Sequence, residues 1–280
     1  MECLDLTECA CTVLRCANGD EKARLTRRHV DAIVQGQAHV TIGDYAPDLR
    51  PNRPDTPELL MPHKMPKRRN AGSLKSKIIL LHAIAHIELN AIDLAWDMLA
   101  RFAPLHKDKA QDNGAQNFTL PTAFYMDWLR VAGDEAKHFL LINDYLKTLG
   151  AAYGDYPAHD GLWEAAEKTR HDIAARLAIV PMVLEARGLD VTPHMIEKFK
   201  SQGDQDTVDI LEIILREEVD HVRIGRHWFE EYCRAHGHDI ETYWQGLVRT
   251  YFHGTLKRPF NHDDRAKAGM IRDWYEPLAD

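Results

Sequence analysis

The sequence predicts an all-α protein whose body is a four-helix bundle. Apolar residues recur at helical spacing over four long stretches, and no run alternates apolar and polar residues clearly enough to indicate a strand. Hydrophobic residues make up 45% of the 280 residues and charged residues 28%, an ordinary composition for a soluble globular protein that buries a large core.

Residues 1–72 are predicted to form an arm packed on this body. A short helix is expected over 20–35, with an inward face of Ala23, Val30, Ile33 and Val34. Prolines at positions 47, 51, 54, 57, 62 and 66 forbid a regular helix or central strand after it. We expect this proline-rich run to lie extended over the body, although its composition also suits a flexible linker.

Residues 73–236 are predicted to form the bundle. Ser73 is a suitable N-cap for its first long helix, Gly150 a suitable stop for its second, and Pro181 should kink its third. Residues 237–280 form a C-terminal extension with a helix over 240–252, an irregular segment at 258–261 and a final helix. The helices expected within the bundle cover 74–101, 122–149, 162–186, 194–200 and 205–235.

Two tetrads in these helices have the same pattern, Glu-x-x-His. They are EAKH at 135–138 and EVDH at 218–221. Residues three apart lie on nearly the same face of a helix, so a carboxylate and an imidazole point the same way in each tetrad. Together with a lone glutamate in each of two other apolar helices, this is the ligand pattern of a di-iron or di-manganese four-helix bundle.

The two lone glutamates are Glu88 in the first long helix and Glu185 in the third, because each falls on the apolar face of its helix. All six residues fall on apolar faces. The apolar neighbours are Leu81, Ile84, Ala85, Ala91, Ile92 and Ala95 around Glu88; Trp128, Val131, Ala132, Phe139 and Ile142 around Glu135 and His138; Leu177, Ala178, Pro181 and Leu184 before Glu185; and Leu211, Ile214, Leu215, Val222 and Gly225 around Glu218 and His221.

Four carboxylates that point into one core must be protonated, paired or bound to metal, because a buried ionised carboxylate costs several kcal/mol. Lysine and arginine are scarce on these faces, which weakens the ion-pair explanation. Two divalent ions would supply about four positive charges, while two imidazoles complete the coordination. The alternative is a set of structural acids hydrogen-bonded to backbone or buried water.

The chain resembles the ferritin-like superfamily and, within it, the domain-of-unknown-function 455 family over nearly its whole length. The resemblance is carried by LHAIAHIELNAIDLAWD, FYMDWLRVAGDEAKHF, YGDYPAHDGLWEAA, VPMVLEARGLDVTP and EEVDHVRIG. It implies a fold and a site rather than a reaction, because that family's function is not established.

Carried over residue by residue, the superfamily pattern implies one metal bound by Glu88, Glu135 and His138. It implies a second metal bound by Glu185, Glu218 and His221, with Glu135 and Glu218 as bridging ligands. Iron is the expected metal and manganese the alternative. The chain is also distantly similar to a di-iron tRNA hydroxylase of the same superfamily.

Four functions fit this ligand set. The first is an O₂-activating oxidase or hydroxylase that takes a small-molecule substrate, and an electron donor if it is an oxygenase. The second is ferroxidation and iron storage, against which the long arm and tail weigh. The third is a di-manganese enzyme that consumes peroxide, and the fourth is a protein whose metals only hold the bundle together. The pair His82 and His86 lies off the Glu88 face, which indicates an outer role or plain packing rather than ligation.

Composition narrows the partners and the location. A net charge of −8 argues against binding nucleic acid through a basic face, although the run KMPKRR at 64–69 is a local exception. No uninterrupted apolar run is long enough to span a membrane, and no signal peptide is visible, so a cytoplasmic protein is expected. Four of the five cysteines fall in the first sixteen residues without a Cys-x-x-Cys pair, which favours reduced thiols over a zinc site.

Overall fold

The computed structural model describes residues 2–61, 64–65, 73–107 and 118–280, and it confirms the prediction of an all-α protein. The chain forms two compact units, Met1–Trp163 and Glu164–Asp280. The division into 1–72, 73–236 and 237–280 stays a prediction, as does the joining of the long helices into one bundle. Of the basic run at 64–69, all but the first two residues lie outside the described part of the chain.

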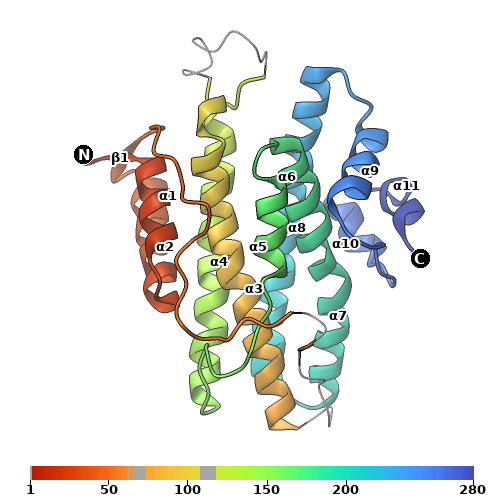
Figure 1. Ribbon diagram of the computed structural model, residues 1–280. Helices are drawn as coiled ribbons and strands as arrows, with labels where there is room; N and C mark the ends of the chain where they lie inside the picture. The colour runs from red at the N-terminus through yellow and green to blue at the C-terminus, as the bar shows by residue number, and fades with distance from the viewer. Residues whose placement is uncertain (1, 62–63, 66–72, 108–117) are drawn as a thin grey trace. The chain divides into compact units, whose positions relative to one another are not determined.

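The first unit is built on two long antiparallel helices, α3 and α4 (Figure 1). Their direction follows from three contacts, which pair Lys77 with Tyr145, Glu88 with His138, and Phe102 with Tyr125. As predicted, the Ser73 hydroxyl caps α3 by accepting a hydrogen bond from the Ser76 N–H. Helix α4 ends near Gly150, as predicted, and Gly150 itself has a left-handed backbone conformation. The elements of this unit are β1 (Glu2–Asp5), α1 (Leu6–Arg15), α2 (Gly19–Val34), β2 (Ala38–Thr41), α3 (Leu74–Arg101), η2 (Ala103–Leu105) and α4 (Thr122–Thr148).

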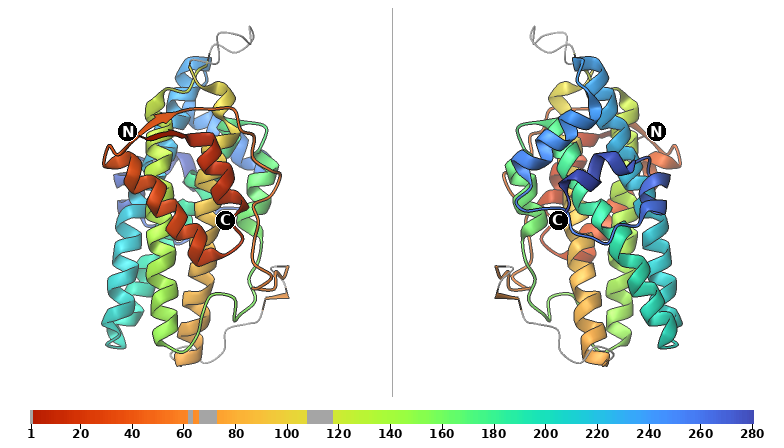
Figure 2. Two further views of the ribbon diagram at one scale, coloured as in Figure 1. Left: turned by 90° about the vertical axis from the view of Figure 1, so that its left-hand side faces the viewer. Right: turned by 90° about the vertical axis from the view of Figure 1, so that its right-hand side faces the viewer.

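The N-terminal segment is more regular than predicted. The sequence prediction missed α1, which packs on α3 while α2 packs on α4, so these two helices cover the long pair (Figure 2). The prediction that the chain has no strand is wrong, because β1 and β2 form a parallel two-stranded sheet. Strands of only four residues are too short to show a clear alternation of polar and apolar residues. Val34, predicted to face inward, is 67% exposed because it is the last residue of α2.

A buried ion pair fixes the N-terminal segment to α3. The Lys22 ammonium of α2 lies 2.5 Å from the Asp93 carboxylate of α3, and neither side chain is exposed. Arg53, from the proline-rich run, reaches the other oxygen of Asp93 at 2.8 Å. The Lys22 ammonium also donates to the Asn52 carbonyl, so helix α2 and the proline-rich run meet at one charged group of α3.

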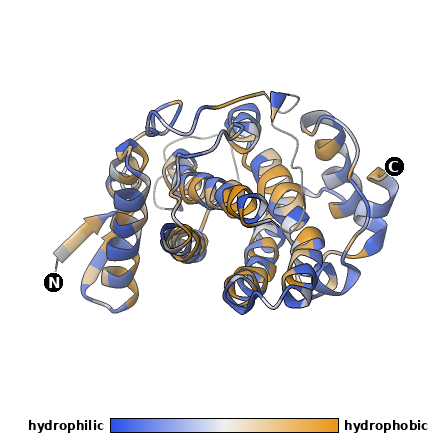
Figure 3. Ribbon diagram, turned by 90° about the horizontal axis from the view of Figure 1, so that it is seen from below, coloured by the Kyte–Doolittle hydropathy of each residue, from blue (hydrophilic) through white to orange (hydrophobic). Residues whose placement is uncertain are grey.

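Helix α3 is long and apolar enough, by length and composition alone, to cross a membrane. However, 78% of its most apolar window is buried inside the protein. It packs against α1, α2 and α4 within its own unit, as a core helix does. Seen along their axes, the helices carry separate hydrophobic and hydrophilic sides (Figure 3), which is the pattern of helices that bury one face.

The second unit contains a second antiparallel pair, α7 and α8, preceded by a turn of wider π-helix, η4. Helix α9 packs on α6, where the Trp244 indole donates to the Ala178 carbonyl at 3.2 Å. Helix α5 (Gly161–Thr169) crosses the boundary between the units. The other elements are α6 (Ile173–Ile179), η4 (Val180–Glu185), α7 (Ala186–Ser201), α8 (Gln205–His236), α9 (Ile240–Tyr251), α10 (His262–Lys267), α11 (Arg272–Tyr275) and η5 (Glu276–Leu278).

Two predictions for this unit are wrong, namely one kinked helix over 162–186 and a separate short helix over 194–200. The chain breaks before Asp172, which restarts a helix by accepting hydrogen bonds from the N–H groups of Ala174 and Ala175. The short helix predicted over 194–200 is part of α7, which begins directly after the π-helical turn and contains Pro193. The sequence prediction thus missed a break in the first case and placed a helix start inside a continuous helix in the second.

Replacing Lys22 tests how strongly the buried pair holds the first unit. Lys22→Met leaves Asp93 buried with only one cationic partner, so we expect the free energy of unfolding to fall by about 3 kcal/mol. Lys147→Met is the matched control, because Lys147 is 43% exposed and pairs with Asp20 and Asp144 on the surface. That control should cost less than about 1 kcal/mol in urea unfolding. Equal losses in the two variants would contradict the role assigned to Lys22.

Candidate metal centre

In the first unit, α3 and α4 bring Glu88, Glu135 and His138 together. The Nδ1 atom of His138 lies 3.2 Å from a Glu88 oxygen and 3.6 Å from a Glu135 oxygen. Glu135 and His138 are fully buried, and Glu88 is 3% exposed. One ligand atom from each of the three lies within 4.8 Å of the others. The predicted face of α4 therefore meets the predicted face of α3.

The electrostatics of Glu88 are unusual for a carboxylate. Burial raises its pKa, and the neighbouring Glu135 carboxylate raises it further, while His138 opposes both; the resulting pKa is about 8. The charged groups that act on Glu88 are thus a second acid and an imidazole. A buried acid in this setting holds a proton at neutral pH unless a cation takes the proton's place.

In the second unit, η4 and α8 bring Glu185, Glu218 and His221 together. Ligand atoms of the three lie within 4.8 Å of one another, and the Nδ1 atom of His221 is 3.8 Å from a Glu218 oxygen. Glu185 and Glu218 are 9% and 8% exposed, and His221 is 1% exposed. Each unit therefore holds one triad of two carboxylates and one imidazole.

The apolar faces predicted around these residues are largely as expected. Most of the named neighbours are buried, but Leu184 and Leu215 are only partly buried. That the two triads form one centre, and that Glu135 and Glu218 bridge its metals, stay predictions.

Glu185 is the last residue of the π-helical turn η4. Helix α8 approaches this turn closely. Pro181 is the second residue of this turn, which starts at Val180. Directly opposite it, α8 has Gly225; a Cβ placed there would lie 2.3 Å from the Pro181 ring. Turns of π-helix often occur at functional sites. The sequence predicted a kink at Pro181, but the extra residue in the turn leaves no signal in the sequence pattern.

The donor set of each triad suits a transition metal. Carboxylate oxygens and imidazole nitrogens are the common protein ligands of iron, manganese and zinc. The sign of the local charge fits as well, because a divalent cation would stabilise the ionised form of Glu88, which burial and Glu135 disfavour. The residues present in each unit therefore fit a metal ion by chemistry and by position.

His82 and His86 bind the loop between α4 and α5 and do not join the triad. The Gly154 N–H donates to Nε2 of His82 at 2.9 Å. His86 contacts the Tyr153 hydroxyl through Nδ1 at 2.9 Å and the His159 carbonyl through Nε2 at 3.1 Å. Nε2 also lies 3.1 Å from the amide nitrogen of Asn90, so a donor and an acceptor both face this atom.

Burial lowers the pKa of His82 to about 4 and that of His86 to about 3. Both rings are therefore neutral at pH 7. The sequence predicted for these histidines either a role around the metal ligands or simple packing. Their hydrogen bonds to the loop could not be predicted, because the partners are about 70 residues away in the chain. Tyr153 and Gly154 lie in YGDYPAHDGLWEAA, one of the segments that carried the resemblance.

The remaining side chains near the tetrads have ordinary roles. The Tyr125 hydroxyl donates to the Phe102 carbonyl at 3.2 Å inside the core. Asp220 is 61% exposed and pairs with Arg223 on the helix surface. All five cysteines are free thiols, and Cys9 and Cys11 are buried on α1.

Comparison with known proteins agrees with the resemblance drawn from the motifs. The family model described as "Protein of unknown function (DUF455)" matches residues 15–276. The chain belongs to this family. It is 41% identical over 271 residues to a Haemophilus influenzae protein described as "Uncharacterized protein", with 94% of this chain and 91% of that protein covered. No solved structure matches the chain. The DUF455 chain is therefore similar over nearly its whole length to a bacterial relative whose description names no activity.

The neutral His82 should make the stability of the protein depend on pH. Its pKa is lowered on folding, so its contribution is complete above the unfolded value of 6.5 and is lost as pH falls towards 4. Wild-type protein should lose up to about 1.4 kcal/mol more per pH unit than His82→Gln over this window. Urea unfolding between pH 4.5 and 7 measures the difference. The exposed His39→Gln variant serves as control, and identical slopes for wild type and His82→Gln would refute the assignment.

The close approach at Gly225 predicts a strong response to one methyl group. Gly225→Ala should lower the free energy of unfolding by about 1–3 kcal/mol, because the rigid Pro181 ring cannot move aside without shifting the π-helical turn. Gly246→Ala on α9 is the matched control, since a Cβ there meets nothing within 4 Å. The control should be neutral or stabilise by up to about 1 kcal/mol. Thermal melts of both variants decide the point, and similar melting temperatures would contradict the steric argument.

Proposed function

We propose that the two triads together hold two divalent metal ions, and that the protein is an O₂-activating di-iron oxidase or hydroxylase. The observation that carries the proposal is the first triad, where Glu88 is buried against Glu135 and the nearest cation-forming group is His138. The charges that act on Glu88 are those of Glu135 and His138, and a divalent cation bound between the two acids would take the place of the proton that Glu88 otherwise holds. The second triad repeats the same donor set.

Charge balance supports two metals rather than one. Four carboxylates carry four negative charges when ionised, and two divalent cations supply four positive charges. The imidazoles of His138 and His221 add neutral nitrogen ligands without changing this sum. One ion would leave two buried acids to be protonated.

Iron is the metal that best suits this donor set together with oxygen chemistry. Ferrous ions held by carboxylates and imidazoles with open positions supply the electrons that activate O₂. The superfamily resemblance favours the same reaction class. A small-molecule substrate and, for a hydroxylase, a separate electron donor complete the proposal.

The side chains of the chain have defined tasks in this proposal. The three-residue spacing on α4 and α8 holds each glutamate and histidine on one face. His138 directs Nδ1 at the same point as the carboxylates of Glu88 and Glu135. The buried apolar neighbours keep water away, which strengthens the attraction between carboxylates and a cation.

Metal loading tests the proposal. Metal-free protein reconstituted anaerobically with Fe(II) should hold about two ions per chain by elemental analysis. Glu135→Gln in the first unit and Glu218→Gln in the second should each reduce loading to one ion or fewer. Asp220→Asn is the matched control, because this exposed acid adjoins His221 in sequence and pairs with Arg223. Less than one ion in the wild type, or full loading in Glu135→Gln, would refute the di-metal centre.

Oxygen uptake separates the reaction classes. An oxidase or hydroxylase should consume O₂ on exposure of the ferrous protein to air while its iron content stays near two per chain. Accumulation of many iron atoms per chain would favour iron storage. Peroxide breakdown by the manganese-loaded protein, without O₂ uptake by the ferrous form, would favour the peroxide-consuming enzyme.

A further inference from the structure

The second unit contains a pocket of about 310 Å³ that none of the six predicted ligands lines. It lies among the π-helical turn η4, the start of α7, the segment after α9 and α10. Its volume is at the lower end of the range typical of small-molecule sites. Its walls are mostly apolar, with the side chains of Val183, Leu184, Phe252, Leu256 and Phe260.

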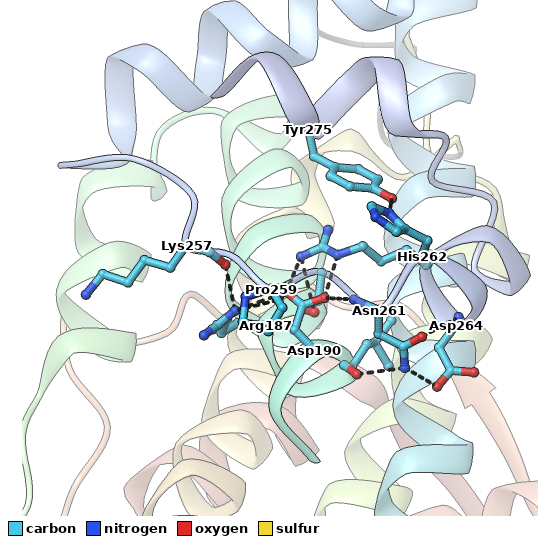
Figure 4. Close-up of polar contacts among 11 residues, drawn as sticks. Arg187, Asp190, Lys257, Pro259, Asn261, His262, Asp264 and Tyr275 are labelled. Carbon is cyan, nitrogen blue, oxygen red and sulfur yellow. Dashed lines mark hydrogen bonds and ion pairs between the residues drawn. The ribbon is translucent and has the colours of Figure 1, made fainter. Parts of the chain in front are cut away.

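One carboxylate lines the pocket, and it is already neutralised. Asp190 receives two hydrogen bonds from the buried Arg265 guanidinium, at 2.8 and 2.7 Å, and a third from the Asn261 N–H at 2.9 Å. Figure 4 shows Asp190 bonded to the Asn261 backbone in this cluster. Arg265 is itself held between the rings of Phe260 and Tyr275, at 5.0 and 4.6 Å from their centroids. The Asp190–Arg265 pair therefore stabilises the fold, and neither charge is available to a ligand.

Arg187 lines the same pocket and keeps part of its guanidinium available. Its Nη1 atom donates to the carbonyls of Lys257 and Pro259 at 2.7 and 3.3 Å, as Figure 4 shows. Its contact with Asp190, at 3.4 Å, also uses Nη1 and is longer than those of Arg265. No hydrogen bond from Nε or Nη2 of Arg187 is found among the described residues. The Arg187 side chain lines the pocket and is 38% exposed, so it is open to a ligand there.

The charge around the pocket is positive overall. Arg187, Lys257 and Arg265 line it together with the single acid Asp190. Two further acids lie close by: Glu276 is neutralised by Arg258, whereas the Asp280 carboxylate accepts from the neutral Thr255 hydroxyl and keeps its charge, so the cations still outnumber the acids. In a chain with a net charge of −8, a pocket with this balance selects anions.

We propose that this pocket binds a small organic monocarboxylate with an apolar body. The Nε–Nη2 edge of an arginine presents two parallel N–H groups, which match the two oxygens of a carboxylate. The apolar body of the ligand would lie against Phe252, Leu256 and Phe260. Phosphate and other compact anions lack the apolar part that these walls require. The site is separate from the two triads, so it stands or falls independently of the proposed metal centre.

Calorimetric titration of the full-length protein with octanoate tests this site, with 1-octanol as the neutral ligand of equal length. Octanoate should bind saturably at one site per chain, and octanol at least about tenfold more weakly. Arg187→Gln should weaken octanoate binding at least about tenfold while leaving octanol unchanged. Arg249→Gln, an exposed arginine on α9 outside the pocket, should bind octanoate like the wild type.

Arg187 also holds two backbone carbonyls, so a second variant separates binding from folding. Leu256→Trp fills the pocket without removing any charge and should abolish binding of both ligands. Thermal melts show whether each variant is folded. Equal affinity for octanoate and octanol, unchanged octanoate binding in folded Arg187→Gln or in folded Leu256→Trp, or no saturable binding by the wild type would overturn the proposal.

Discussion

Each buried carboxylate of this protein must be matched by positive charge or by a proton, and helix α3 shows both outcomes. Asp93 on one face meets Lys22 and Arg53, two cations brought by the N-terminal segment. Glu88 on another face meets a second acid and a histidine, and its pKa rises to about 8. The same helix therefore carries one carboxylate that ties the fold together and one that suits a metal. The contrast matters because desolvation penalises both acids alike.

The second unit repeats this division. Asp190 is neutralised by Arg265, which fixes α10 to α7. Glu185 and Glu218 lie together with His221 instead. Arg187 then remains as a cation whose charge is not fully matched, beside apolar walls. The structural ion pairs, the triads and the pocket thus follow from one condition: each buried or half-buried charge must be balanced by an opposite charge.

Helical periodicity was sufficient to predict the long helices and the members of both triads. Glu88, Glu135 and His138 could be assigned to inward faces because their apolar neighbours recur with the same period over residues 81–95 and 128–142. The β1–β2 pair and the π-helical turn were missed, since four to six residues are too few to define a period. The pairing of Lys22 with Asp93 was missed for another reason. Those residues are 71 positions apart, and no local pattern links them. The partners of His82 and His86 escaped prediction in the same way.

The ion pair between Lys22 and Asp93 also has a consequence for synthesis of the chain. Lys22 leaves the ribosome well before Asp93, which lies 71 positions further along the chain. At roughly 5–20 residues per second, this interval lasts about 4–14 s. During that time the apolar faces of α1 and α2 have no α3 or α4 to cover them, and the Lys22 ammonium stays in water. The N-terminal helices therefore keep their apolar faces uncovered until α3 and α4 have been synthesised.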